Sequence, residues 1–299
     1  MTNNVTVLRQ SRLNRLEVRL DEQLNGFQPG RFAGYGAAEG MVIRKVRERR
    51  PEDSSSRLHV PITRSTGIEH VWLAEPKYTL TAGVVVDLSP SLFYGTGHGE
   101  KVETAIDAAY ASIWLTSRHG NRCGLVTVAG RQPKYLRHSQ GTQHVQRCRA
   151  VLSAVRTEDG ITTDLSAGLR TFLREFKQRG LCVVVSDFLQ PGWEAALAEV
   201  ARKHTVICFQ VLDKREFEIE DIGLVSLYDP VKMEDIEVDT SDSEFRKDFA
   251  KAASVEQDRI RQAIVQAGAR HEELWTHQDW AESIYQFFSR KRQKGRVGR

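Results

Sequence analysis

The feature that most constrains the fold is a β-branched run that ends in an acid, Val84-Val85-Val86-Asp87. A continuous apolar run of this kind is typical of a strand that is buried on both faces of a parallel sheet. The pattern returns at residues 181–187, where a second apolar run ends in Ser186 and Asp187. Because helix-like segments lie between such runs, we predict an α/β protein with a doubly wound, mainly parallel sheet of the Rossmann-like kind.

Strands and helices are expected to alternate from residue 79 onward. Strands are predicted at 79–87, 123–129, 133–137, 181–187, 205–212 and 271–275, with a weak hairpin at 217–228. Helices are predicted at 101–119, 144–155, 165–179, 194–203, 243–268 and 279–291, the third of them closed by Gly180. Right-handed crossovers are the default for such a chain.

The first 75 residues follow a different pattern. Leucines spaced by three and four residues predict a helix over 8–25 that packs on the main domain. Glycines and polar turns then indicate a small β-rich extension of short, irregular strands, one of them at 58–62. We therefore divide the chain into an extension (1–75), a main domain (76–289) and a basic tail (290–299).

The composition, with 40% hydrophobic and 27% charged residues, is that of an ordinary globular protein. No run approaches the roughly 20 apolar residues that span a bilayer. The N-terminus lacks the order of a signal peptide, so a cytoplasmic location is expected. The four cysteines form no CxxC pair, and we expect buried, reduced thiols at Cys123, Cys148, Cys182 and Cys208.

The formal net charge of +4 comes from the tail, because the last ten residues carry six positive charges and no acid. Such a tail can contact nucleic acid or an acidic surface, or it can be a solvated chain end. We favour the solvated end, and nucleic acid is not an expected partner.

Three predicted loops carry the residues with metal-binding chemistry. Asp87, Ser89 and Ser91 follow the first buried strand, Thr163 precedes a helix, and Asp187 ends another buried strand. Sites in open α/β sheets lie beyond the carboxyl ends of the strands, where these loops should converge. Two carboxylates and several hydroxyls are hard oxygen donors suited to Mg²⁺. Thr162 is an alternative to Thr163, and Asp164 is predicted to be a helix N-cap.

This arrangement resembles the metal-ion-dependent adhesion site of von Willebrand factor A-type domains. More narrowly, the chain resembles the bacterial family known as domain of unknown function 58, from about residue 25 to 288. Segments similar to family motifs are 47–53, 62–67, 121–125 and 184–188, together with the pair Asp213 and Glu216. Several features depart from the pattern. The Pro-Gly-Asp-Asp block is reduced to Pro51-Glu52-Asp53-Ser54 and its tryptophan is missing, Pro90 lies inside the metal loop, and the sequence shows none of the membrane helices that many members have.

The resemblance implies a protein-interaction module in which bound Mg²⁺ or Mn²⁺ captures an acidic side chain of a partner protein. It also implies a partner of the MoxR-type AAA+ ATPase class. One alternative is a phosphatase-like hydrolase that uses Asp87, although Ser89 stands where such enzymes need a second acid and no P-loop or GxSxG motif is present. The other alternative is a scaffold with an inactive metal site.

Overall fold

The computed structural model describes residues 9–18, 37–55, 58–93, 95–96, 99–117, 120–130, 132–154, 163–229, 234–280 and 283–284. The strands are β1 (Ala37–Glu48), β2 (His70–Thr79), β3 (Thr81–Asp87), β4 (Gly95–Thr96), β5 (Gly99–Glu100), β6 (Arg122–Val128), β7 (Lys134–Ser139), β8 (Leu181–Ser186), β9 (Thr205–Leu212), β10 (Leu224–Asp229), β11 (Glu234–Asp239) and β12 (Arg270–Trp275). The helices are α2 (Val60–Thr66), α3 (Lys101–Ser117), α4 (Thr142–Ala154), α5 (Leu165–Glu175), α6 (Glu194–Lys203) and α7 (Ser243–Gln266), with 3-10 turns η2 (Pro90–Phe93) and η4 (Lys214–Glu216). Residues 9–18 form a further helix.

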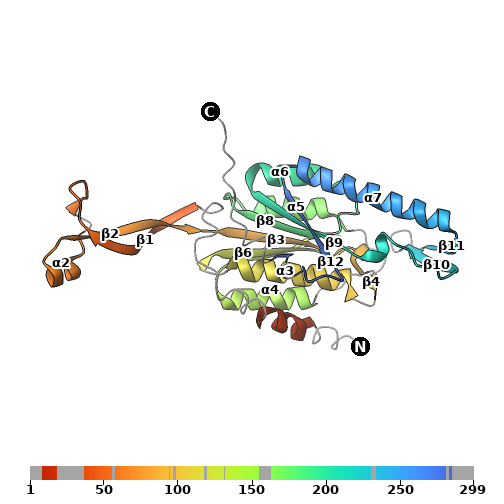
Figure 1. Ribbon diagram of the computed structural model, residues 1–299, viewed down its shortest axis with the longest axis horizontal. Coiled ribbons are helices and arrows are strands. Elements are labelled where there is room, and N and C mark those ends of the chain that lie inside the picture. The colour runs from red at the N-terminus through yellow and green to blue at the C-terminus, as the bar shows by residue number, and fades with distance from the viewer. Residues whose placement is uncertain are drawn as a thin grey trace.

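A six-stranded sheet with the order β12-β9-β8-β3-β6-β7 forms the centre of the molecule (Figure 1). Its neighbouring strands are parallel except for β7, which pairs antiparallel with β6 at the edge. The predicted α/β class with a mainly parallel sheet is therefore confirmed. The central strand β3 pairs with β6 on one side and β8 on the other.

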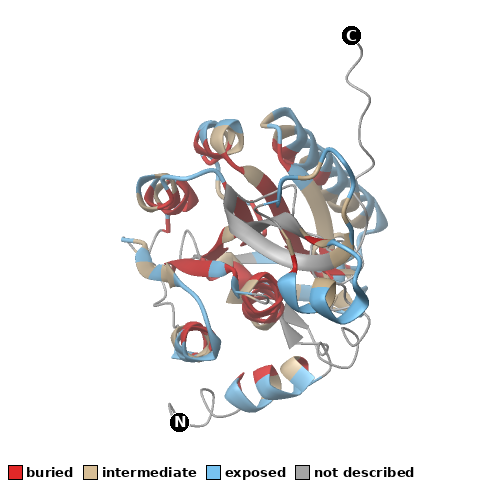
Figure 2. Cartoon of the chain, turned by 90° about the vertical axis from the view of Figure 1, so that its left-hand side faces the viewer, coloured by how far each residue is buried: buried red, intermediate tan, exposed pale blue. Residues whose placement is uncertain are grey.

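Helices cover both faces of this sheet, and its four inner strands are buried at nearly every position. Val84 and Val86 pack in one core cluster with residues of α3 and α4, whereas Val85 packs in a second cluster with residues of α5, α6 and α7. Figure 2 shows the buried sides of these helices turned toward the sheet. Successive side chains of a strand point to opposite faces, so one β-branched run supplies both cores.

The helix at residues 9–18 packs on α3, as the leucine spacing predicted. Leu13 is fully buried in the first core cluster. Arg9 lies 2.5 Å from Glu103, and Arg12 lies 2.5 Å from Asp107. The remaining residues of the predicted helix over 8–25 lie outside the described part of the chain.

The N-terminal extension differs from the predicted short strands. β1 and β2 form one long antiparallel hairpin, which projects from the end of the sheet where β3 begins (Figure 1). Residues 60–66 form helix α2 rather than a strand. Pro61 lacks the N–H that a strand ladder needs but suits a first helical turn, and Gly67, with φ of 73°, ends the helix. The domain boundary at residue 75 stays a prediction.

Two further boundaries differ from expectation. α5 ends at Glu175 instead of near 179, and the Phe176 ring then stacks on Phe172 with centroids 4.3 Å apart. Gly180 is therefore not its C-cap; a Cβ there would lie 2.0 Å from the Thr81 carbonyl oxygen, so only glycine permits this approach. The hairpin expected at 217–228 instead joins residues 224–229 to the acidic strand 234–239.

The other predicted strands and helices are present within a few residues of their expected ends. Of the final helix at 279–291, the structure describes residues 279–280 and 283–284, and 280, 283 and 284 are helical. All four cysteines are buried and free, and burial raises the pKa of Cys123 to about 12. None of the helices in the described ranges is long and apolar enough to cross a membrane. The tail at 290–299 lies outside those ranges.

Candidate functional site

The candidate site lies at the carboxyl edge of the sheet, where β3 and β8 end side by side. Asp87 is the last residue of β3, and Ser186 is the last residue of β8. The parallel register pairs Val86 with Val185, so the loops that follow leave the sheet at the same level. This edge is opposite the end from which the β1–β2 hairpin projects (Figure 1).

Asp87 is almost completely buried, and its carboxylate is held by neighbouring donors. The Ser186 hydroxyl donates to Oδ2 at 2.8 Å, and the Ser89 backbone N–H donates to Oδ1 at 3.0 Å. No cationic side chain pairs with Asp87 among the residues described. Burial, and then the charge of Asp187, raise the pKa of Asp87 to about 7. The site therefore contains a buried carboxyl group whose negative charge is poorly compensated.

The two predicted serine ligands lie beside Asp87. The Ser89 hydroxyl is 3.4 Å from Asp87 Oδ2 and 3.0 Å from the Ser91 hydroxyl. Pro90 between them begins the 3-10 turn η2, in which the Leu92 N–H donates to the Ser89 carbonyl. Since proline suits the first position of a helical turn, Pro90 is compatible with this arrangement of the hydroxyls.

Asp187 follows β8 and is also buried, but a cation accompanies it. Its Oδ2 lies 2.9 Å from Lys101 Nζ, and its Oδ1 accepts the Leu189 N–H at 3.3 Å. Phe188, between these residues, has φ of 60° and turns the chain sharply after Asp187. The Phe188 ring is buried against Trp193, which fixes this turn.

Thr163 is buried near the same edge but contacts a different residue. Its hydroxyl donates to Gln190 Oε1 at 3.2 Å, on the loop after β8. No described hydrogen bond joins Thr163 to Asp87 or Asp187. Asp164 caps α5 by accepting the Ala167 N–H, as predicted. The alternative ligand Thr162 lies outside the described residues.

Lys101 is the site residue that the sequence did not indicate. Its side chain is 0% exposed, and Nζ lies 2.6 Å from Glu216 Oε1 as well as close to Asp187. Burial alone would lower the pKa of Lys101, but the charges of Asp187 and Glu216 outweigh burial and raise it, so the side chain is an ammonium. A lysine at the start of a helix carries no local pattern that reveals a contact with residues 86 and 115 positions away.

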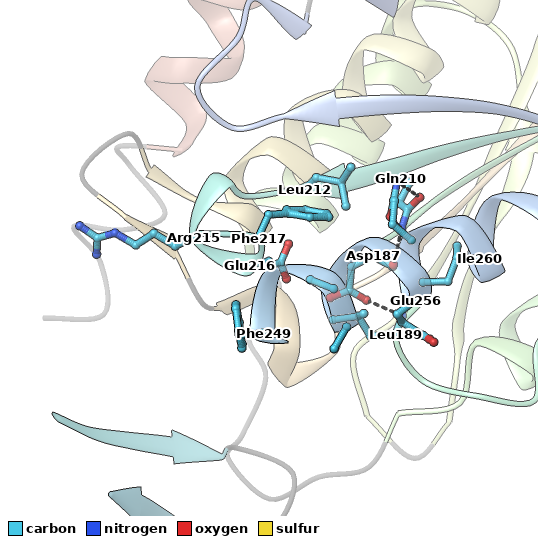
Figure 3. A pocket seen from close by; sticks show the side chains of 13 residues that line it. Asp187, Leu189, Gln210, Leu212, Arg215, Glu216, Phe217, Phe249, Glu256 and Ile260 are labelled. Carbon is cyan, nitrogen blue, oxygen red and sulfur yellow. Dashed lines mark hydrogen bonds between the residues drawn. The ribbon is translucent and has the colours of Figure 1, made fainter. Parts of the chain in front are cut away.

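A cavity of about 410 Å³ opens beside these carboxylates, between the end of β9 and α7 (Figure 3). Asp187 and Glu216 belong to its wall, and the rest is mainly apolar, including Leu212, Phe217 and Phe249.

The donor set fits a hard divalent cation. The described residues contain no group of three or more His, Cys, Asp or Glu side chains that could hold a metal. What they offer instead is two buried carboxylates with serine hydroxyls, which are oxygen donors of the kind Mg²⁺ prefers. The poorly compensated charge of Asp87 is the observation that favours a cation here.

The chain is similar to several known proteins. The chain is 30% identical over 290 residues to an uncharacterized protein of Mycobacterium tuberculosis, covering 96% of this chain and 90% of that protein. Among solved structures, it resembles an aerotolerance-related membrane protein from Bacteroides fragilis (TM-score 0.46, 14% identity, 70% of this chain and 98% of that chain). It also resembles a von Willebrand factor type A protein from Catenulispora acidiphila (TM-score 0.37, 14% identity, 76% of this chain and 52% of that chain). Residues 45–259 match the family described as "Protein of unknown function DUF58", and the chain belongs to that family.

Proposed function

We propose that this protein is a metal-dependent interaction module. The von Willebrand A-like α/β fold suits a protein-interaction role, and the observation that carries the metal dependence is the buried Asp87 carboxylate with two serine hydroxyls beside it. Asp87, Ser89, Ser91, Thr163 and Asp187 would hold Mg²⁺ or Mn²⁺, directly or through water. A divalent ion held there supplies a Lewis-acidic position for a carboxylate from another protein.

The chain's own residues would prepare the site for this role. Ser186 and the Ser89 N–H orient the Asp87 carboxylate, and the Phe188 turn holds Asp187 at the adjacent strand end. Burial keeps bulk water from screening these charges. Nothing in this role requires turnover, so we propose a binding protein and not an enzyme.

The partner we propose presents an acidic side chain, and the family resemblance points to a MoxR-type AAA+ ATPase. Pull-down of such an ATPase by the full chain should succeed with Mg²⁺ and fail with EDTA. Capture that is equal in both conditions would contradict metal-dependent docking.

Thermal unfolding tests the metal site directly. A ligand that binds only the folded state stabilises it by about 2.7 kcal/mol at one hundred times its Kd. We expect Mg²⁺ and Mn²⁺ to raise the Tm of the wild type relative to EDTA, and Asp87→Asn to abolish that rise because one anionic ligand is lost. Asp164→Asn, which changes the nearby helix cap, is the matched control and should keep the metal response. A wild type without any metal response at millimolar concentrations would refute the proposal.

A further inference from the structure

Lys101 places a positive charge beside Asp187, one of the carboxylates that would hold the metal. Its ammonium lies 2.9 Å from Asp187 Oδ2, and the side chain is completely buried. Asp187 in turn interacts electrostatically with Asp87. The two carboxylates and one ammonium therefore share a buried space, in which charges interact much more strongly than in water.

A divalent ion bound to Asp187 would lie close to the Lys101 ammonium, which contacts the same carboxylate. The two cations would share one carboxylate, and their repulsion in a buried site opposes metal binding. Lys101 thus neutralises part of the negative charge of Asp187, as a metal ion would, whereas Asp87 has no paired cation in the described structure.

Glu216 gives the ammonium a second partner. Its Oε1 lies 2.6 Å from Lys101 Nζ, and its Oε2 accepts the Asp213 N–H at 3.0 Å in the cap of η4. This cap fixes Glu216 in place. When Asp187 turns to a metal, Lys101 can stay paired with Glu216, at the wall of the cavity shown in Figure 3.

We infer that Lys101 is a built-in cation that competes with the divalent ion for Asp187, and that Glu216 receives the ammonium when the metal binds. Lys101 is thus a positioning residue that sets the metal affinity of the site. The inference rests on the proposed function, since it concerns the same metal site.

Mn²⁺ titration of the purified full chain, followed by calorimetry or by the spectroscopic signal of free Mn²⁺, tests this inference. Lys101→Met removes the competing charge with a side chain of similar length, and we expect Mn²⁺ to bind about tenfold more tightly or better. Lys101→Arg keeps the charge and should show no such gain. Lys214→Met is the control for net charge, because it removes an exposed lysine from η4, the 3-10 turn that carries Glu216.

Glu216→Gln should have the opposite effect. Among the described residues it leaves Asp187 as the only anionic partner of Lys101, so we expect weaker Mn²⁺ binding, while the amide oxygen can still accept the Asp213 N–H. Glu256→Gln removes a charge from the same cavity wall, where Glu256 pairs with Arg259, and should change the affinity less.

The outcomes separate this inference from the proposed function. If folded Lys101→Met binds Mn²⁺ no more tightly than a wild type that binds it, the inference is wrong and the metal site stands. If Lys101→Met binds Mn²⁺ and the wild type does not, the inference is supported and the metal-dependent function of the wild type is refuted. Absence of binding in both overturns both. If Lys101→Met does not fold, Glu216→Gln decides, and an unchanged or tighter affinity overturns the inference.

Discussion

The two buried aspartates of the candidate site occupy equivalent strand ends but different electrostatic environments. Asp187 contacts the Lys101 ammonium, whereas Asp87 is held by hydroxyl and amide donors alone, and its pKa is raised to about 7. Residue type does not distinguish them, because burial and partners decide how each carboxyl group titrates. The same reasoning applies to a buried histidine far from the site.

His204 provides a prediction on pH. It is 3% exposed, and burial lowers its pKa to about 4. Below about pH 6.5, His204 therefore binds a proton in the unfolded chain but stays neutral in the folded protein until the pH approaches 4. The contribution of neutral His204 to the free energy of unfolding is fully present above pH 6.5. It is lost as the pH falls toward 4, and the total loss is about 3 kcal/mol.

Denaturant unfolding at several pH values measures this loss. His204→Phe, which cannot titrate, should lose less free energy of unfolding than the wild type between pH 6.5 and 4. His277→Gln, at an exposed position, should keep the wild-type slope. Equal slopes in the wild type and His204→Phe would show that His204 does not carry the effect.

At the scale of the element, β3 and α5 approach so closely at Gly83 that a side chain at this position would clash with the helix. The Phe172 and Phe176 rings lie over Gly83 in the middle of β3, and a Cβ there would come within 2.5 Å of both rings. The early end of α5 places Phe176 in this contact. Gly83 thus lets a helix and its aromatic pair pack directly on the strand that carries Asp87.

Gly83→Ala should therefore destabilise the protein by about 1–3 kcal/mol, the usual cost of overpacking a core. Gly130→Ala is the control, because a Cβ at that position would meet nothing within 4 Å. Urea unfolding of both variants measures the difference. A Gly83→Ala protein as stable as the control would mean that the two rings move aside without cost.

At the scale of the whole molecule, the candidate site and the N-terminal hairpin lie at opposite ends of the sheet (Figure 1). β2 ends at Thr79 and β3 begins at Thr81, so the hairpin emerges from the amino end of the central strand. The site lies beyond the carboxyl end of the same strand. Changes at the tip of the hairpin should therefore not alter the proposed metal site.

Shortening the hairpin tests this separation. Glu48 pairs with His70, so residues 49–69 can be replaced by an Asn-Gly turn. The shortened protein should keep the wild-type Mn²⁺-induced rise in Tm. Loss of that rise would show that the tip supports the site.

The sequence predicted the sheet and the polar residues at the ends of its strands because both depend on local patterns. The run Val84-Val85-Val86 can be buried only where both faces are covered, and this requirement placed β3 at the centre. The acids and hydroxyls after it then had to lie at the carboxyl edge. The sequence also predicted a helix over 8–25, of which the structure describes 9–18, and its packing on the main domain, because leucines at helical spacing need a surface to cover.

Helix α2 replaced a predicted strand for a local reason, because Pro61 suits the first turn of a helix. Other features followed from contacts that no local pattern contains. α5 ends early, and Phe176 then packs against Gly83 of β3. The assignment of the five metal ligands, Asp87, Ser89, Ser91, Thr163 and Asp187, stays a prediction. By itself, the sequence determined the layers of the fold and the strand ends where polar groups gather, because those depend on periodicity. Only the tertiary structure placed Lys101 between Asp187 and Glu216, since an ion pair between residues so distant in sequence exists only once the sheet has formed.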